Sequence, residues 1–251
     1  MKLMGIVNAT PDSFSDGGAY DPVAHGLRLL AEGADVLDVG GESTRPGAVP
    51  VPEEEELRRV LPVVRALVGA GGLVSVDTRH ARVAAHALAA GARWVNDVSG
   101  GEDEDMFGVC ASEAATLVIM HMRGSPSTMR YLATYHDVSA EVWMHLGDRA
   151  LMARAAGVAE VWLDPGIGFA KTAEQSLTLL RGLRGRDNAR VLVGASRKSF
   201  LAALGDQPTP ADRLEGSLAV AIHCREAGVG MIRVHDVAAT RRALATWDAL
   251  G

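Results

Sequence analysis

Residues 73–98 read LVSVDTRHARVAAHALAAGARWVNDV, and this stretch contains the unit from which the whole chain is built. A short β-branched apolar run at 73–77 ends in an aspartate and is followed by an alanine-rich helical pattern at 79–90. Gly91 then stands where a helix commonly ends, and a second apolar run follows at 93–98. The order strand, helix, strand predicts two parallel strands joined by a helical crossover.

The same alternation runs through all 251 residues. Apolar runs that predict strands occur at 3–8, 34–39, 73–77, 93–98, 116–121, 160–164, 191–194 and 230–234. Helical patterns follow them at 22–33, 53–69, 79–90, 103–113, 137–156, 173–184, 211–227 and 236–249. Asp21 and Pro22 support the first helix, because they supply an N-cap and a proline at the first helical position.

Eight such pairs indicate an α/β fold with a parallel sheet. No linker or low-complexity tract divides the chain, and no Gly-x-Gly-x-x-Gly follows the first strand, which disfavours an open dinucleotide-binding sheet. We therefore expect a single domain over residues 1–251 with the TIM-type (β/α)8 barrel fold.

The composition excludes several classes of protein. The net charge of −6 and the pI near 5.7 disfavour a nucleic-acid partner, which needs a basic patch. The N-terminal residues show no signal-peptide pattern and no apolar run reaches about 18 residues, so we expect a cytoplasmic protein without a membrane partner. Cys110 and Cys224 are far apart in sequence and predict buried thiols rather than a disulfide or a zinc site.

Polar residues close every predicted strand. They are Asn8, Asp38, Asp77, Asn96 with Asp97, His121 after Met120, Asp164, Ser196 to Lys198 just beyond the seventh strand, and Arg233 with His235. A single strand-end aspartate is as readily a turn or cap residue. Eight polar ends in register favour an active site at the C-terminal rim of the barrel, where barrel enzymes build theirs.

The types of residue in this ring suggest its ligand. Asp77, Asn96 and Asp164 suit an edge of N–H donors and ring nitrogens, whereas Lys198, Arg233 and His235 supply cations for carbonyl or phosphate oxygens.

Lysine is scarce enough to be informative, since only Lys2, Lys171 and Lys198 occur among 25 basic residues. Lys198 stands at the entry to a helix, where an anion binds well. For Lys171 a functional role and an exposed surface position remain equally open.

The loops at 10–18 and 40–47 are long and rich in small residues. The first carries Phe14, an aromatic residue at a loop tip, and the second carries Arg45 between glycines. Long loops without structure of their own are usually binding loops or lids, which we expect here in place of ordinary surface turns.

The strand-end segments form an ordered set of motifs. They read MGIVNATPDSFSDGG at 4–18, DVGGESTRPG at 38–47, VSVDT at 74–78, VNDVSGG at 95–101, MHMRG at 120–124, LDPGIGFAK at 163–171, GASRKS at 194–199 and IRVHD at 232–236. With these motifs, essentially the whole chain resembles the dihydropteroate synthases, a pterin-binding family. Any one motif alone is weak, whereas the ordered set is specific.

The resemblance implies a reaction and a set of site residues. The family joins a 7,8-dihydropterin that carries a hydroxymethyl diphosphate to para-aminobenzoate, and releases diphosphate and 7,8-dihydropteroate. By this resemblance Asn8 holds the Mg2+ cofactor that bridges the diphosphate. The residues expected at the pterin are Asp77, Asn96, Asp164 and Lys198, with Met120 and Phe169 as apolar walls and Gly194 and Ser196 beside them. Those expected at the diphosphate are Thr44, Arg45, Arg233 and His235, and those at para-aminobenzoate are Phe14, Pro46 and Ser199.

The expected chemistry agrees with the residue types. Diphosphate leaves once its charge is neutralised, and Asp38 and Asp77 are placed by strand order to stabilise the cation that develops on the pterin's exocyclic carbon. The aryl amine is already nucleophilic, so no strong general base is required. We expect Asp38, Asp77, Lys198, Arg233 and His235 to be the catalytic residues.

Two rival functions remain open on the sequence. The first is a pterin-binding methyltransferase, which shares the barrel but needs no residues that bind a diphosphate. The second is a non-catalytic paralogue, which would bind pterin without turnover. The resemblance also implies a homodimer, formed through the apolar last helices. Many family members close the bottom of the barrel with an N-terminal hairpin, and since the first motif begins at Met4, the sequence leaves open how the bottom is closed.

Overall fold

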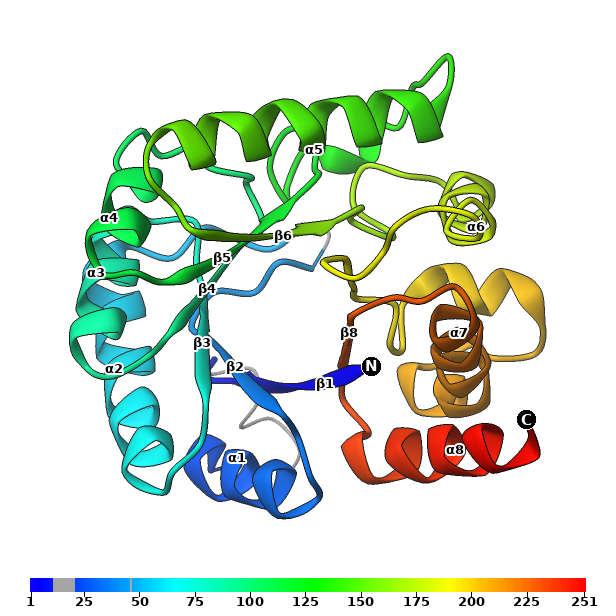
Figure 1. Ribbon diagram of the computed structural model, residues 1–251, viewed down its shortest axis with the longest axis horizontal. Helices are drawn as coiled ribbons and strands as arrows, with labels where there is room; N and C mark the ends of the chain where they lie inside the picture. Colours follow the sequence, from blue (N-terminus) through cyan, green and yellow to red (C-terminus); the bar gives the residue numbers. More distant parts are fainter. Residues whose placement is uncertain (11–20, 46) are drawn as a thin grey trace.

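The computed structural model describes residues 1–10, 21–45 and 47–251. Within them, eight parallel strands form one sheet in the order β6-β5-β4-β3-β2-β1-β8-β7. An isolated bridge between Leu163 and Val191 joins the two ends of this sheet and closes the barrel. Figure 1 shows the helices as an outer layer around the strands. The predicted (β/α)8 barrel is confirmed.

The elements follow the predicted order, and most are shorter than predicted, although β1 is longer and β6 and α2 have the predicted bounds. The strands are β1 Lys2–Asn8, β2 Val36–Gly40, β3 Val74–Asp77, β4 Trp94–Asp97, β5 Thr116–Met120, β6 Glu160–Asp164, β7 Leu192–Val193 and β8 Met231–Val234. The helices are α1 Pro22–Ala31, α2 Glu53–Gly69, α3 Ala81–Ala89, α4 Met106–Ser112, α5 Val138–Ala155, α6 Ala173–Arg181, α7 Leu214–Glu226 and α8 Val237–Leu250. The start of the seventh predicted helix is instead a 3-10 turn, η4 Pro210–Arg213, and two further 3-10 turns are η2 Met129–Tyr131 and η3 Ser199–Leu204.

The predicted helix boundaries have the expected local causes. The Asp21 side chain accepts a hydrogen bond from the Val23 backbone N–H at 2.9 Å and caps α1. Gly91 follows α3 with a φ of +108°, and a Cβ there would lie 2.7 Å from Cγ1 of Val68. Both the backbone conformation and the space therefore require glycine at this turn.

The main apolar core lies between the strands and the helices. α2, for example, buries Val60, Val63, Val64 and Leu67 on one face. Burial of each such side chain contributes roughly 1.5–3 kcal/mol. Cys110 in α4 and Cys224 in α7 are free and buried, which confirms the predicted buried thiols, and burial raises the pKa of each to about 12. No helix in the described part of the chain is long and apolar enough to cross a membrane.

A separate apolar cluster fills the barrel interior at the N-terminal half of the strands, and we call it the lower cluster. Its members are Met4, Val36, Trp94, Val118, Trp162, Leu192 and Met231. The rings of Trp94 and Trp162 lie with their centroids 5.4 Å apart, and the Trp162 indole N–H donates to Glu160 at 2.9 Å. These side chains close the bottom of the barrel.

The next inward-facing side chain on several of these strands is polar. Side chains alternate between the two faces of a strand, so a residue two positions further on faces the same interior. Asn96 follows Trp94 in this way, Asp164 follows Trp162, and Arg233 follows Met231. The strands therefore carry polar groups to the C-terminal mouth of the barrel.

Candidate active site

Arg233 of β8 reaches two carboxylates on neighbouring strands. Its Nε donates to Asp38 Oδ2 of β2 at 2.6 Å and its Nη2 donates to Asp77 Oδ2 of β3 at 2.7 Å. The amide of Asn96 in β4 donates to the same Asp38 oxygen at 2.9 Å. Four strands thus bring their end residues into one hydrogen-bonded network, which we call the arginine network.

This network leaves acceptor capacity unused. Asp38 is fully buried, and its Oδ1 has no hydrogen-bond partner among the residues that the structure describes. Burial raises the pKa of Asp77 to about 7, against the opposing effect of Arg233. A buried polar atom without a partner is costly, so such atoms commonly mark sites that a ligand completes.

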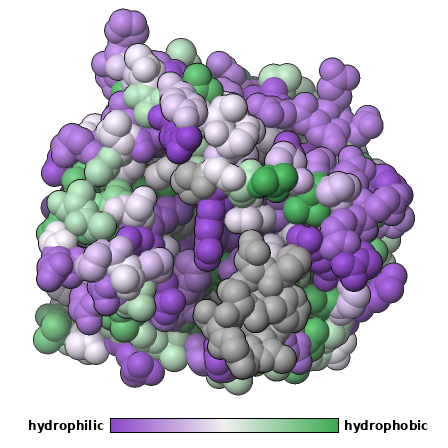
Figure 2. Space-filling view, turned by 180° about the vertical axis from the view of Figure 1, so that it is seen from behind, coloured by the Kyte–Doolittle hydropathy of each residue, from purple (hydrophilic) through white to green (hydrophobic). Residues whose placement is uncertain are grey.

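Asp164 and Lys198 lie on the other side of the mouth. A Cβ added to Gly194 would lie 3.7 Å from Asp164 Oδ2 and 3.9 Å from both Lys198 Nζ and Arg233 Cβ. The space above Gly194 is therefore bordered by both charged groups and by Arg233. Burial lowers the pKa of Lys198 to about 8 and raises that of Asp164, and each charge opposes the shift of the other. Figure 2 shows this face of the molecule, with a hollow near its centre that hydrophilic residues border.

Apolar side chains stand beside these polar groups. Lys198 Nζ lies 4.3 Å from the centre of the Phe169 ring and donates to the Ile167 carbonyl oxygen at 2.5 Å. Met120 is buried in a cluster with Met122 and Ala170, against which Phe169 packs. An aromatic wall next to convergent polar groups suits a flat heterocycle.

A strained residue turns Lys198 toward the site. Arg197 has a φ of +57°, a conformation that costs an L-residue roughly 1–2 kcal/mol. Its guanidinium donates to both oxygens of Asp236, at 2.9 and 2.5 Å, and its backbone N–H donates to Ser217 Oγ at 2.9 Å. These bonds hold the backbone in the conformation that places Lys198.

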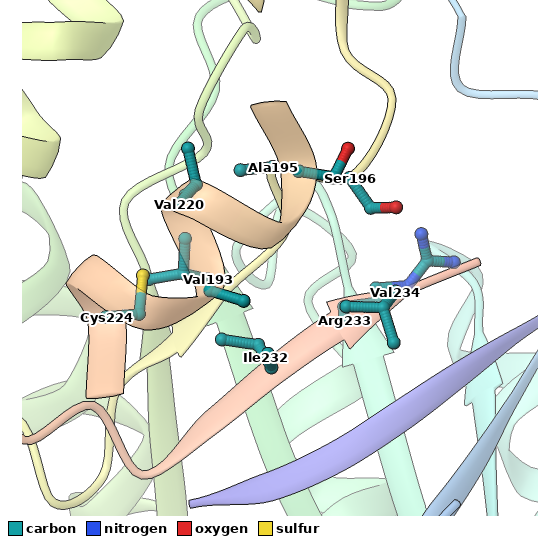
Figure 3. A pocket seen from close by; sticks show the side chains of 10 residues that line it. Val193, Ala195, Ser196, Val220, Cys224, Ile232, Arg233 and Val234 are labelled. Atoms are coloured by element: carbon teal, nitrogen blue, oxygen red, sulfur yellow. The ribbon is translucent and has the colours of Figure 1, made fainter. Parts of the chain in front are cut away.

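The surroundings of His235 disfavour the cation predicted for it. Burial, followed by the nearby charge of Arg233, lowers the pKa of His235 to about 3. Nδ1 of His235 lies 3.1 Å from Ser196 Oγ. The same oxygen accepts a hydrogen bond from the backbone N–H of His235 at 3.2 Å. At neutral pH His235 is therefore a neutral hydrogen-bonding residue. Figure 3 shows Ser196 and Arg233 together at one end of the apolar space beneath α7.

The loop after β2 borders a small pocket next to the arginine network. Glu42, Thr44 and Asp77 line this space together with Pro126 from the loop after β5. The Gly47 backbone N–H donates to the Pro126 carbonyl oxygen at 3.0 Å, so the two loops meet. Arg45 is exposed in this loop, and Ser199 is exposed at the start of η3. Phe14 and Pro46 lie outside the described residues.

Two groups are candidates for holding a metal. Asn8 ends β1, is half-buried, and lies in register with Gly40 of β2. Mg2+ keeps several waters and is commonly bound through one or two carboxylates and substrate phosphates, so Asn8 offers one oxygen ligand, an amide in place of a carboxylate. Glu42, Glu56 and His80 also converge, with ligand atoms within 4.8 Å of one another. In this cluster Arg79 forms an ion pair with Glu42, and Nδ1 of His80 lies 2.7 Å from Oε2 of Glu56, while Oε1 of Glu56 has no hydrogen-bond partner among the described residues.

Lys171 is the residue that sequence reasoning left undecided. The surface alternative is wrong, because Lys171 is 9% exposed and its Nζ donates to His121 and to the Phe169 carbonyl oxygen. The scarcity of lysine was the available signal. The Ile167 carbonyl, by contrast, accepts from Lys198 through the backbone, so its role could not be predicted from the type of residue.

Comparisons with known proteins agree with this geometry. A family model described as "Pterin binding enzyme" matches residues 4–235. Dihydropteroate synthase of Synechocystis sp. is 44% identical over 258 residues, which cover 99% of this chain and 89% of that protein. The enzyme of Neisseria meningitidis serogroup C is 44% identical over 262 residues, 100% of this chain and 93% of that protein.

Solved structures give the same result. Dihydropteroate synthase from Thermus thermophilus in complex with 4-aminobenzoate matches with a TM-score of 0.90 and 44% identity, covering 100% of this chain and 94% of that one. The complex of the same organism's enzyme with 6HMPPP matches with a TM-score of 0.86 and 42% identity, again covering 100% and 94%. The chain therefore belongs to the pterin-binding enzymes and, within them, to the dihydropteroate synthase family of transferases.

Proposed function

We propose that this chain condenses (7,8-dihydropterin-6-yl)methyl diphosphate with para-aminobenzoate, giving 7,8-dihydropteroate and diphosphate. The observation that carries the proposal is the convergence of Asp77, Asn96, Asp164, Lys198 and Arg233 from five strand ends on one mouth. Carboxylate and amide acceptors lie there beside half-buried cations, as a nitrogen heterocycle with departing phosphates requires.

The pterin ring binds between the two sides of the mouth. Asp77, Asn96 and Asp164 bond its nitrogen edge, and Lys198 donates to its carbonyl oxygen. Met120 and Phe169 supply apolar walls, while the missing side chain at Gly194 lets the ring approach Asp164 and Lys198. Burial strengthens these interactions because little water competes with them.

The departing diphosphate is bound by groups at the outer edge of the site. Arg233 has committed two donors to Asp38 and Asp77, so its remaining N–H groups serve the anion. Neutral His235 contributes an N–H, with its Nδ1 facing Ser196, and Thr44 and Arg45 add donors from the loop after β2. Asp38 and Asp77 stabilise the positive charge that develops on the pterin's exocyclic carbon as the diphosphate leaves.

The remaining assignments concern the second substrate and the cofactor. Phe14, Pro46 and Ser199 border para-aminobenzoate, whose uncharged amine attacks the exocyclic carbon. Asn8 would hold Mg2+ through its amide oxygen. When bound, this ion neutralises charge on the diphosphate and so makes it a better leaving group.

We also propose a cytoplasmic homodimer formed through α7 and α8. Leu218, Val220 and Ile222 of α7 are only half-buried in the single chain, so α7 retains apolar surface for a partner. Sedimentation velocity gives a dimer if this is correct and a 26.3 kDa species if it is not.

A coupled diphosphate-release assay tests the function directly. We expect release that depends on para-aminobenzoate, on the pterin diphosphate and on Mg2+. Binding of the pterin without release would identify a non-catalytic paralogue. Release that does not require the aryl amine would show hydrolysis instead of transfer, and activity in the presence of a chelator would overturn the role of Asn8 and Mg2+.

A further inference from the structure

Lys171 is a buried lysine that no step of the proposed reaction uses. It follows β6 and lies behind the wall that faces the pterin. Its Nζ donates to Nδ1 of His121 at 2.9 Å, to the His121 carbonyl oxygen at 3.3 Å and to the Phe169 carbonyl oxygen at 2.9 Å. The acceptors found for it among the described residues are thus two carbonyl oxygens and an imidazole nitrogen, and none is a carboxylate.

These bonds join the end of β5 to the loop between β6 and α6. The loop forms one wall of the site, since its Gly166 N–H donates to Asp164 at 2.7 Å and its Ile167 carbonyl accepts from Lys198. Gly166 has a φ of +67°, and a Cβ there would overlap the His121 carbonyl oxygen. The loop therefore passes directly against the end of β5, where Lys171 fastens it.

The same loop holds a strained residue. Ala170 has a φ of +46°, which an L-residue adopts at a cost of roughly 1–2 kcal/mol. Its carbonyl oxygen accepts from the Tyr135 hydroxyl at 3.1 Å, and the Lys171 ammonium binds the carbonyl of the preceding Phe169. Tertiary bonds rather than local preference hold this conformation.

The protonation states fit this arrangement. Burial lowers the pKa of His121 to about 3, so at neutral pH its Nδ1 is free to accept from Lys171. Burial also lowers the pKa of Lys171 to about 7, while the charge of Asp164 opposes this shift. Three acceptors around one nitrogen match the three N–H groups of an ammonium, whereas a neutral amine has only two.

We propose that Lys171 is a positioning residue for pterin binding, which fastens the β6–α6 loop to β5 and so holds Asp164, the Ile167 carbonyl and Phe169 in the arrangement that receives the pterin. This inference rests on the proposed function. Lys171 does not touch the substrate, so its effect falls on the pterin and not on para-aminobenzoate.

The test compares Lys171→Met with Lys2→Met, a control at an exposed position of β1. Calorimetry with (7,8-dihydropterin-6-yl)methyl diphosphate measures pterin binding without turnover, and steady-state kinetics give the KM for para-aminobenzoate. We expect Lys171→Met to weaken pterin binding roughly 10- to 100-fold while the KM for para-aminobenzoate changes by less than about threefold. Lys2→Met should bind as the unaltered chain does.

A second pair of variants tests the acceptor and remains informative if Lys171→Met does not fold. His121→Asn keeps an acceptor near the position of Nδ1 and should retain pterin affinity, whereas His121→Leu removes it and should weaken binding. Equal affinities of Lys171→Met and the unaltered chain, or of the two His121 variants, would overturn the inference. The inference would also be overturned if Lys171→Met weakened the binding of both substrates to the same extent and lowered the melting temperature in parallel. If the unaltered chain binds no pterin diphosphate, the proposed function itself fails.

Discussion

The lower and upper halves of the barrel interior come from the same strands and differ completely in character. Trp94, Trp162 and Met231 fill the lower half, where the lower cluster contains no titratable group. Two residues further along the same strands, Asn96, Asp164 and Arg233 face the mouth. Because side chains of a strand alternate with period two, one strand supplies a packing residue and then a chemical residue to the same interior.

The lower half of the barrel interior therefore mainly stabilises the fold, whereas the upper half carries the polar groups of the candidate active site. The upper half buries Asp38, Asp77, Asp164 and most of Lys198 and Arg233, and buried charge costs free energy even when it is paired. The lower half offsets that cost with close apolar packing. Substitutions in the two halves should therefore affect different measurements.

The largest effect on folding is expected in the lower cluster. Trp162→Ala removes a side chain that is 5% exposed and packs on Trp94, and should reduce the free energy of unfolding by about 3–5 kcal/mol. Urea denaturation measures the loss. Trp247→Ala in α8, where the indole is only half-buried, is the control. Equal losses of unfolding free energy for both variants would show that the lower cluster stabilises the fold no more than a half-buried surface residue does.

The next effect is expected on catalysis. Lys198→Ala removes, and Asp164→Asn neutralises, a charged side chain that we propose binds the pterin, and each should lower kcat/KM roughly 10²- to 10³-fold, about 3–4 kcal/mol of transition-state stabilisation. Steady-state kinetics measure this, and thermal melts should show far smaller losses than Trp162→Ala. Near-normal kinetics for both variants would refute their assignments.

His121, directly after β5, should make the fold sensitive to acid. The folded-state pKa of His121 is about 3, below the unfolded value near 6.5, so the unfolded chain binds more protons as pH falls through this window. Stability present above pH 6.5 is therefore lost on acidification, by about 1.4 kcal/mol at pH 5.5. Urea denaturation at pH 8 and pH 5.5 should show a smaller loss for His121→Asn. The exposed His86→Asn serves as control, and an equal reduction in both would contradict the prediction.

The smallest effect is expected outside both halves. Asp21→Ala removes the side-chain cap of α1 and should cost about 1 kcal/mol of folding free energy without changing kinetics. Asp21→Asn, which keeps a capping oxygen, should lose less. A change in kcat/KM for Asp21→Ala would show that the outer helices are coupled to the mouth.

Much of the architecture could be predicted because its causes are local. The cap of α1 and the positive φ of the glycine after α3 depend on residues within a few positions of one another, whereas the close contact of that glycine with Val68 is tertiary. The gathering of Asp77, Asn96 and Asp164 also followed, since parallel strands in a barrel end on the same rim. The filling of the barrel bottom did not follow, because nothing in the sequence says that Trp94 and Trp162 face each other.

Charge and partnership at the site could not be predicted. Lys171 and Lys198 each follow a residue with positive φ, yet only Lys198 faces the mouth. His235 and Arg233 look like equivalent cations in the sequence. Burial makes His235 neutral, whereas Arg233 remains charged between two carboxylates.

By itself the sequence determined the alternating elements, the barrel they close, the residues at its rim and the family to which the chain belongs. Only the tertiary structure decided which rim groups are charged, which are already paired and which backbone carbonyls complete the site. The physical reason is the distance along the chain over which each kind of interaction acts. Periodicity and capping act between neighbours in the chain, whereas protonation and hydrogen bonding depend on burial and on partners brought together from distant strands.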